Sequence, residues 1–405
     1  MGDIAVVNKR GGDSIPALIL GTGITALGVI RSLSTHGIKC YSVGRQNHLV
    51  RASRWYNNAP ISDTDLCPKE ALHDYLRKLP FDRAVVMPCG DRWTRMLSAL
   101  PEELRSVYKF SLPDENTVDR LMNKASLSQI LKSANVPHPS TLILSDESDL
   151  KSISKDSIKH TFLKPTDSEV FFRKFQVKAF QVASYEDAVD KYRRIHSCGM
   201  DVVYQEYIPG PASNHYFIDG FVDRHGIIRA SFARHRFRMY PPDFGNSSYM
   251  KSIPIEEVST AHEALKRLLN MTGYRGIFSA EFKLDPRDNE FKLLEINVRP
   301  WWYIWFAERC RVPIAMMAYL DSLEMDVKTI ENYRTDYGLI YPYYDFSACM
   351  QMMKNRELSI VSWLKSWLTS SKANFFIRDP IPSIIGTLNW LIWFIRHRIG
   401  STRES

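Results

Sequence analysis

Residues 279–300, SAEFKLDPRDNEFKLLEINVRP, constrain the fold most, because they predict two strands joined by a tight turn. Side chains alternate between the two faces of a strand, so Glu295 and Asn297 share one face, and Glu281 can meet them from the neighbouring strand. Carboxylate and amide oxygens are the ligands that Mg²⁺ takes between a protein and a phosphate. We therefore predict a metal site at these three residues. The alternative is an exposed polar face, which the apolar residues alternating with them in LLEINVRP disfavour.

Three cationic side chains are candidates for binding an anion beside this metal site. Arg299 continues the polar face and offers a planar fork for a phosphate or a carboxylate. Lys164 ends an apolar strand in TFLKP, and Lys124 follows a predicted helix start in RLMNKASL. Each lysine alone is explained more simply as a surface residue. Residues 202–210, VVYQEYIPG, predict a strand that breaks into a hinge whose backbone groups can pair with an adenine.

The N-terminal segment predicts a parallel α/β layer. Residues 16–30, PALILGTGITALGVI, indicate a strand, a glycine-rich turn and a helix start, and strands alternate with helices to about residue 113. The spacing of Gly21, Gly23 and Gly28 is not the full dinucleotide fingerprint, and the next strand has no acidic residue for a ribose. We therefore favour a tight turn, or a small anionic substrate at these glycines, over a nicotinamide oxidoreductase.

The middle of the chain predicts a helix-containing part, 114–205, followed by a strand-rich part, 201–300. TVDRLMNKASLSQILKSA indicates one amphipathic helix over 117–134, which Asn116 or Thr117 can cap. The stretch TDSEVFFRKFQVKAFQ predicts a flexible hairpin that carries Arg173, Lys174 and Lys178.

Composition and charge narrow the classes of partner and compartment. The 405 residues, 44% of them hydrophobic, suffice for two or three domains. The net charge of +8 fits a nucleotide, a nucleic acid or an acidic membrane without choosing among them. The six cysteines are scattered and form no CxxC pair, which disfavours a zinc site or a disulfide framework and indicates reduced thiols in a cytosolic protein.

The C-terminal segment is apolar, aromatic and basic. Residues 381–395, IPSIIGTLNWLIWFI, fall short of the ~20 apolar residues of a spanning helix, and Arg-His-Arg follows them. Just upstream, Trp363 and Trp367 stand at helical spacing, with Lys365 off that face. The segment fits a helix at a membrane interface or a helix packed on the protein's own core, and the tryptophans and basic flank slightly favour the interface.

The motifs MNKASL, FLKP, QEYIPG, EFKLDP and LEINVRP, in this order, resemble the landmarks of the ATP-grasp superfamily. The resemblance covers residues 16 to about 310 and is closest to the carboxylate–amine ligase branch that includes D-aspartate ligase, through EFKLDPRD and LLEINVRPWW. It implies a fold of mixed α/β and α+β class, with a Rossmann-like parallel layer, a two-lobed ATP-grasp fold and a helical C-terminal tail. The expected domains are an N-terminal layer at 1–113, a lid lobe at 114–205, a metal-binding lobe at 206–325 and a C-terminal extension at 326–405.

The resemblance also implies roles for individual residues. The ATP phosphates are expected at Lys124 and Lys164. The adenine is expected at a hinge made of Gln205, Glu206, Tyr207 and Ile208. Mg²⁺, or Mn²⁺, is expected at Glu281, Glu295 and Asn297, and the transferred phosphate beside the catalytic residues Arg299, Arg236 and Arg238. Candidates for substrate contacts are Asp91, which matches an acidic position of the family, and, from the sequence itself, Gly21, Gly23 and Trp301.

The implied activity is the ATP-dependent joining of a carboxylate to an amine through an acyl-phosphate, with ADP as product. The expected partners are a small-molecule acid and amine, with no nucleic acid, in the cytoplasm or at the cytoplasmic face of a membrane. The family's lid loop is rich in glycine, whereas TDSEVFFRKF contains none. This departure leaves open a second hypothesis, a relative that binds nucleotide without ligating.

Overall fold

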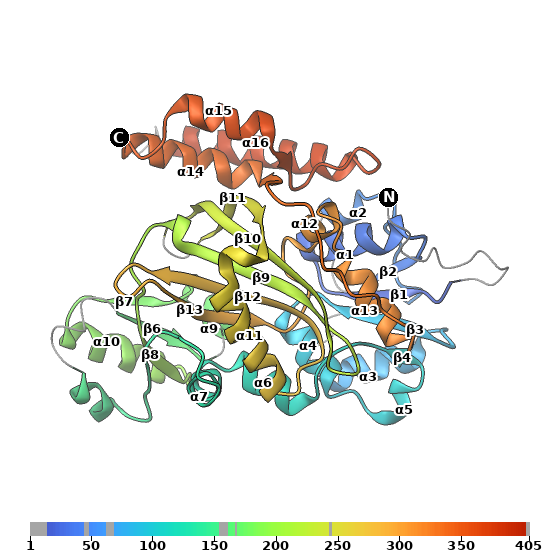
Figure 1. The fold of residues 1–405 in the computed structure, drawn as a ribbon, viewed down its shortest axis with the longest axis horizontal. Helices are drawn as coiled ribbons and strands as arrows, with labels where there is room; N and C mark the ends of the chain where they lie inside the picture. Colours follow the sequence, from blue (N-terminus) through green and yellow to red (C-terminus); the bar gives the residue numbers. More distant parts are fainter. Residues whose placement is uncertain are drawn as a thin grey trace.

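Three sheets organise the chain, with helices on their faces and a layer of C-terminal helices along one side (Figure 1). The computed structural model describes residues 14–43, 48–61, 69–153, 161–166, 168–242 and 245–401. The predicted mixture of a parallel layer, antiparallel sheets and a helical C-terminal part is confirmed.

The N-terminal layer is a parallel sheet in the order β2-β1-β3-β4. Its strands are β1 (Ala17–Leu20), β2 (Cys40–Val43), β3 (Ala84–Pro88) and β4 (Tyr108–Lys109). Its helices are α1 (Gly23–Thr35), α2 (His48–Arg51), α3 (Lys69–Lys78), α4 (Asp91–Ser98) and α5 (Glu102–Arg105). All of β1 is buried, as expected for a strand covered on both faces. Gly21 turns the chain into α1 with a φ of +117°, which a residue with a side chain would adopt only under strain.

The lid sheet is antiparallel, in the order β5-β8-β6-β7. Its strands are β5 (Thr141–Ile143), β6 (Thr161–Pro165), β7 (Phe180–Val182) and β8 (Val202–Glu206), and α10 (Tyr185–His196) packs on it. The single helix predicted over 117–134 is instead two helices, α6 (Glu115–Met122) and α7 (Lys124–Ser133). Asp114 caps α6, in place of the predicted Asn116 or Thr117. Asn123 starts α7 by accepting bonds from two backbone amides, which makes Lys124 its first residue.

The prediction of a flexible hairpin after Lys164 was wrong. Most of this segment is the helix α9 (Ser168–Phe175). Phe171 and Phe175 are four residues apart, so they share a helix face, and their ring centroids lie 4.8 Å apart. Phe180 packs against both rings, which fixes the helix on the lid sheet. Asp167 and the side chain of Arg173 lie outside the described part of the structure.

The large sheet has the order β13-β12-β9-β10-β11-β14-β15. Its strands are β9 (His215–Val222), β10 (Ile228–Tyr240), β11 (Asn246–Ile253), β12 (Gly276–Asp285), β13 (Glu290–Asn297), β14 (Gly338–Ile340) and β15 (Ser371–Lys372). One core joins this sheet to α11 (Ser259–Met271), α6 and α7. A second core joins it to β1, α1, α12 (Ile304–Arg309) and α13 (Ile314–Ser322), so the N-terminal layer and the large sheet are packed together.

The C-terminal layer consists of α14 (Pro342–Lys354), α15 (Ile360–Thr369) and α16 (Ile381–Ser401). Figure 1 shows it along one side of the molecule, where α14 lies over β10 and β11. Trp363 and Trp367 both donate to the buried Asp345 of α14, at 2.9 and 2.8 Å, and therefore face the protein. The two tryptophans therefore serve the contact of α15 with the protein, and the inference from them to a membrane interface was wrong. Within the described ranges, no helix has the length and apolar character needed to cross a membrane.

Candidate active site

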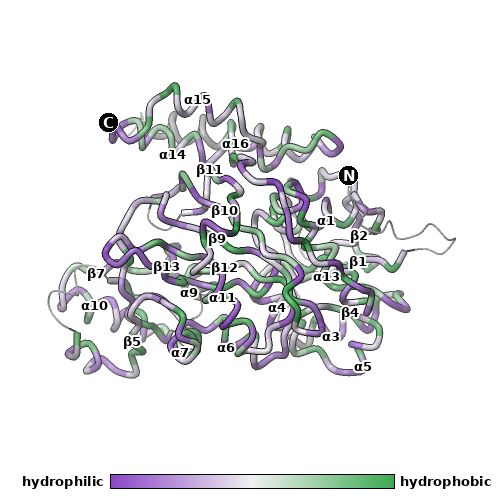
Figure 2. The backbone as a smooth tube through the Cα atoms, in the orientation of Figure 1, coloured by the Kyte–Doolittle hydropathy of each residue, from purple (hydrophilic) through white to green (hydrophobic). Residues whose placement is uncertain are grey.

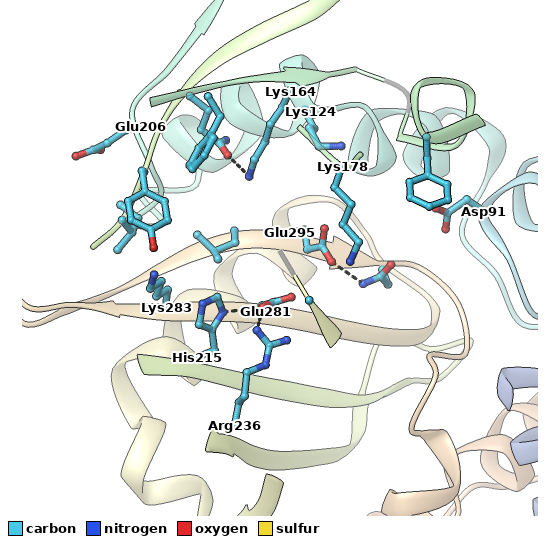
Figure 3. Close-up of a pocket in the computed structure, with 18 of the residues that line it drawn as sticks. Asp91, Lys124, Lys164, Lys178, Glu206, His215, Arg236, Glu281, Lys283 and Glu295 are labelled. Carbon is cyan, nitrogen blue, oxygen red and sulfur yellow. Dashed lines mark hydrogen bonds and ion pairs between the residues drawn. The ribbon is translucent and has the colours of Figure 1, made fainter. Parts of the chain in front are cut away.

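A cleft of about 460 Å³ separates the lid sheet from the large sheet (Figure 3). Residues from both lobes and from the N-terminal layer line it. Those that the sequence singles out are Asp91, Lys124, Lys164, Gln205, Glu206, Tyr207, Ile208, Arg236, Glu281, Glu295, Asn297 and Arg299. Side chains more than 200 positions apart in the chain therefore face one space.

The lid wall of the cleft is cationic. Lys164 extends from β6 and donates to Gln205 Oε1 at 2.7 Å, and Gln205 in turn donates to Thr141 Oγ1 at 3.0 Å. Burial, together with the nearby charge of Lys124, lowers the pKa of Lys164 to about 8. The ammonium group is still protonated at neutral pH. Figure 3 shows Lys124 and Lys164 side by side, both facing the large sheet.

The facing wall is acidic and comes from the predicted hairpin. Glu281 of β12 lies directly opposite Glu295 of β13 in the strand register, and both face the cleft. Asn297, two residues along the same strand, donates to Glu295 Oε1 at 3.4 Å. The β alternation that predicts a shared face for these residues is therefore realised in the structure.

Two neighbours hold Glu281 in place. His215 of β9 lies 2.7 Å from Glu281 Oε1 through Nδ1, and Arg236 of β10 lies 3.1 Å from the same oxygen. Burial favours a higher pKa for Glu281, but the Arg236 charge and the His215 hydrogen bond outweigh it and lower the pKa. Burial lowers the pKa of His215 to about 4, so this imidazole is neutral at pH 7. The carboxylate is ionised and its orientation is fixed.

The donor set suits a cation that is shared with a phosphate. In the described ranges, no group of three or more His, Cys, Asp or Glu side chains is arranged to hold a metal by itself. Two carboxylates and one amide, each binding through one oxygen, leave about three of the six positions of an octahedral Mg²⁺ to waters and phosphate oxygens, which is its usual mode of binding. Glu281, Glu295 and Asn297 therefore fit a metal that arrives with a nucleotide.

The predicted adenine hinge follows β8 at one end of the cleft. Glu206 is held by Arg287 at 2.6 Å and by the backbone amide of Ser140 at 3.1 Å. Tyr207 lies under the ammonium group of Lys283, which is 4.6 Å from the ring centroid. Ile208 is buried. The hinge thus combines an apolar floor with a fixed carboxylate, which suits a base and its ribose.

A second cavity of about 350 Å³ adjoins the cleft and shares Arg236, Glu281, Glu295 and Arg299 with it. Trp301, a predicted substrate contact, lines this cavity and is also buried. Its indole N–H has no hydrogen-bond partner among the described residues. A buried donor without a partner is costly unless a ligand or water accepts its proton. The cavity can therefore receive a polar group.

Of the predicted substrate contacts in the N-terminal layer, Asp91 lies at the cleft, whereas Gly21 and Gly23 do not. Asp91, at the start of α4, forms an ion pair with Arg299 and thereby joins the N-terminal layer to the cleft. Gly21 and Gly23 are absent from the described residues that line either cavity. Thr25, in the helix that these glycines open, does reach the second cavity.

The prediction that Arg238 is a catalytic residue beside Arg236 was wrong. It donates to both oxygens of Asp345, at 2.7 and 3.0 Å, and its guanidinium group lies beneath the C-terminal layer instead of in the cleft. Residues 236 and 238 would share a face of a regular strand. The register between β10 and β11 shifts between these two residues, and such a bulge turns the side chains that follow it.

Sequence reasoning missed two ionisable lining residues, His215 and Lys283, and gave no role to a third, Lys178. Lys178 follows α9, and Figure 3 shows it reaching toward Glu295. His215 and Lys283 are paired residues on β9 and β12. Alternation along β12 could have placed Lys283 on the face of Glu281, whereas His215 depends on pairing between distant strands, for which the sequence has no local signal.

Comparisons with known proteins agree with this architecture. No family model matches the sequence. The chain is 26% identical over 314 residues to a D-aspartate ligase of Enterococcus faecium (strain Aus0004), and the match covers 73% of each chain. An L-amino acid ligase from Bacillus licheniformis superimposes with a TM-score of 0.58 at 15% identity, over 81% of this chain and 79% of that one.

A third comparison is with a nucleotide complex. The biotin carboxylase domain of 2-oxoglutarate carboxylase from Hydrogenobacter thermophilus, in complex with MgADP, ADP and bicarbonate, superimposes with a TM-score of 0.62 at 17% identity. The match covers 80% of this chain and 73% of that one. The predicted resemblance is confirmed: this chain has the ATP-grasp fold, and its sequence is similar to that of a D-aspartate ligase.

Proposed function

We propose that this protein is an ATP-dependent ligase that joins a carboxylate to an amine through an acyl-phosphate, with ADP and phosphate as products. The observation that carries the proposal is the pairing of two walls across one cleft. Lys124 and Lys164 come from the lid lobe, and Glu281, Glu295 and Asn297 come from the large sheet. A cationic wall facing an acidic one is what a magnesium–triphosphate requires.

The first step transfers the γ-phosphoryl group of ATP. An oxygen of the substrate carboxylate forms a bond to the γ-phosphorus, and the bond from that phosphorus to the β–γ bridging oxygen breaks, so that ADP leaves with the electron pair. Lys164 and Arg299 neutralise the negative charge that spreads over the transferred group. A Mg²⁺ ion held by Glu281, Glu295 and Asn297 would add charge at the phosphates.

The second step forms the amide. The amine nitrogen attacks the acyl carbon, the bond from that carbon to the phosphate oxygen breaks, and inorganic phosphate leaves while the nitrogen loses a proton. No protein nucleophile takes part, so the protein acts by positioning and by charge. The second cavity, beside Arg236 and Trp301, is our candidate for the acid and amine.

The test is a screen for ADP release over acids paired with amines, with D- and L-aspartate as the first acids because of the sequence relative. We expect release that requires ATP, Mg²⁺ and both substrates. Lys164→Met should nearly abolish it. Lys266→Met, which changes an exposed lysine of α11 paired with Glu263, is the matched control and should retain it.

A second candidate is nucleotide binding without ligation. The helix α9 occupies the place where the family has a glycine-rich lid, and this observation favours the alternative. The two functions separate in one pair of measurements. A protein that binds MgATP in calorimetry but releases no ADP across the whole panel would support the second candidate and contradict the first.

The proposed setting follows from the chemistry of the substrates. We place the enzyme in the cytoplasm, which supplies ATP and Mg²⁺, with a small-molecule acid and amine as partners and no nucleic acid. The five cysteines that the structure describes are unpaired, which suits a reducing compartment. We also propose that the C-terminal layer contacts the surface of a membrane, independently of the ligase activity.

A further inference from the structure

The outer face of the C-terminal layer exposes an unusual number of large aliphatic side chains. Exposed fractions reach 87% for Leu368, 79% for Ile377 and 72% for Val361. The exposed large hydrophobic residues of α15 are Ile360, Val361, Leu364 and Leu368. Those of α16 are Ile381, Ile384, Leu388, Leu391 and Ile392, and Phe375 and Ile377 lie in the connecting loop. Figure 2 shows α15 at the edge of the molecule, with hydrophobic residues along it.

Helical spacing turns these residues into two continuous stripes. On α15 they recur at one, four and eight positions after Ile360, and on α16 at three, seven, ten and eleven positions after Ile381. Both series lie on one side of a helix with 3.6 residues per turn. Contiguous exposed apolar surface of this kind marks a site of interaction.

The stripes cannot turn inward, because other sides of both helices are already held against the protein. Trp363 and Trp367 anchor α15 through their hydrogen bonds to Asp345. Trp390 anchors α16, since its ring stacks on Tyr343 with the centroids 5.9 Å apart. The tryptophans thus serve the inner contact, and the aliphatic side chains are left for an outer partner.

The charged residues near the two stripes indicate which kind of partner this surface binds. From residue 358 to 401 the sequence has one acidic residue, Asp379, and it is buried in an ion pair with Arg31 at 2.9 Å. Lys365 and Arg378 are exposed on the layer. Glu357, just before α15, is the exposed acidic residue beside these cations in the described part of the layer. An apolar face with an excess of exposed positive charge is complementary to anionic lipid headgroups, whereas a second copy of the same face would bring like charges together.

We propose that the face formed by α15, the 375–377 loop and α16 lies on an anionic lipid bilayer, with its aliphatic side chains in the interfacial region. The proposal is independent of ligase activity, because it concerns a surface outside the cleft and is tested without turnover.

The test is co-sedimentation with phosphatidylcholine vesicles that contain either no anionic lipid or about 30 mol% phosphatidylglycerol. We expect the full chain to bind the anionic vesicles about tenfold more tightly than the neutral ones. The double variant Leu368→Asp with Ile377→Asp should lose at least about tenfold of that binding. Met271→Asp changes a residue that is 48% exposed on α11, outside the layer, and should bind as the wild type does.

Three outcomes would overturn the proposal. One is a wild-type protein that sediments with neither vesicle at low ionic strength. Another is equal binding by the double variant, whose fold is checked by circular dichroism. The third is a wild-type dimer in solution that the double variant converts to a monomer, because the face would then belong to a second copy of the chain. As an independent measurement, Leu368→Trp should show fluorescence quenching by brominated phosphatidylcholine in anionic vesicles, and an unquenched signal would also count against the bilayer.

Discussion

Lys164 donates a hydrogen bond of 2.7 Å to the side-chain oxygen of Gln205, and the two residues lie on paired strands of the lid sheet. The bond holds the ammonium group over the cleft, across from Glu281 and Glu295. Burial lowers the pKa of this group to about 8. A group of this type is charged below its pKa and neutral above it, so the charge available to a phosphate is present at pH 7 and is lost as the pH rises.

The first prediction concerns pH. Because kcat/KM reports the ionisation of the free enzyme, we expect kcat/KM for ATP to fall about tenfold per unit above about pH 8. Initial rates of ADP release between about pH 6.5 and 9.5 measure this fall. Lys164→Arg keeps its charge throughout that range and should lose the alkaline limb, whatever its absolute rate. If kcat/KM of the wild type stays constant across this pH range, the charge of Lys164 does not act on the phosphates of ATP.

The second prediction concerns the metal. Glu295→Gln and Glu281→Gln remove one charge each with little change in volume, and we expect each to lower the rate of ADP release about 10²–10³-fold and to weaken the dependence on Mg²⁺. Titration of the rate with Mg²⁺ measures both effects. Glu290→Gln, on the same hairpin but exposed and paired with Lys292 at 2.7 Å, is the control. Equal rates and equal Mg²⁺ dependence in all variants would argue against a metal at this hairpin.

The third prediction concerns the buried link between the sheet and the C-terminal layer. Asp345 accepts hydrogen bonds from Arg238, Trp363 and Trp367 and is fully buried. Asp345→Ala leaves the Arg238 charge buried without its partner, so we expect the free energy of unfolding to fall by about 3–5 kcal/mol. Urea denaturation measures this change. Glu263→Ala, which breaks an exposed pair on α11, should change stability little, and a similar loss in both variants would contradict the buried-pair explanation.

The fourth prediction concerns the second cavity. Trp301 and Trp305 are both buried tryptophans whose indole N–H has no hydrogen-bond partner among the described residues, but only Trp301 lines this cavity. Trp301→Phe keeps most of the packing and removes the donor, so we expect KM for one of the two substrates to rise about five- to tenfold. Trp305→Phe should leave both KM values unchanged. If neither variant changes a KM value, or if both raise the same KM equally, the cavity does not bind substrate through this donor.

The metal hairpin was the part of the site that sequence alone could predict, because its information is local. The turn over 285–289 fixes which strands pair, and alternation then assigns a face to Glu281, Glu295 and Asn297. The positions of Lys124 and Lys164 could not be predicted from such local information. Their place across the cleft was implied by the order of family motifs, and it depends on how two lobes pack.

The wrong predictions also have physical causes, because each depends on contacts or backbone irregularities that local sequence patterns do not show. Alternation predicts that Arg236 and Arg238 share a face, and a bulge that no residue pattern announces separates them. The segment of α9 was predicted as a hairpin because basic residues stand between its phenylalanines, although the phenylalanines have helical spacing. The tryptophans of α15 indicated an exposed interface, but a single buried acceptor, Asp345, turns them inward and leaves the aliphatic residues outside.

The most direct test of the acyl-phosphate mechanism follows the oxygen atoms of the acid. Once the screen has identified a substrate pair, the acid is labelled with ¹⁸O in its carboxylate, and the released phosphate is analysed by mass spectrometry. Our account predicts that each phosphate released carries one oxygen from the acid, because that oxygen bonds to the γ-phosphorus before the amine displaces it. Phosphate that contains oxygen only from ATP and water, in a reaction that forms the amide, would contradict it.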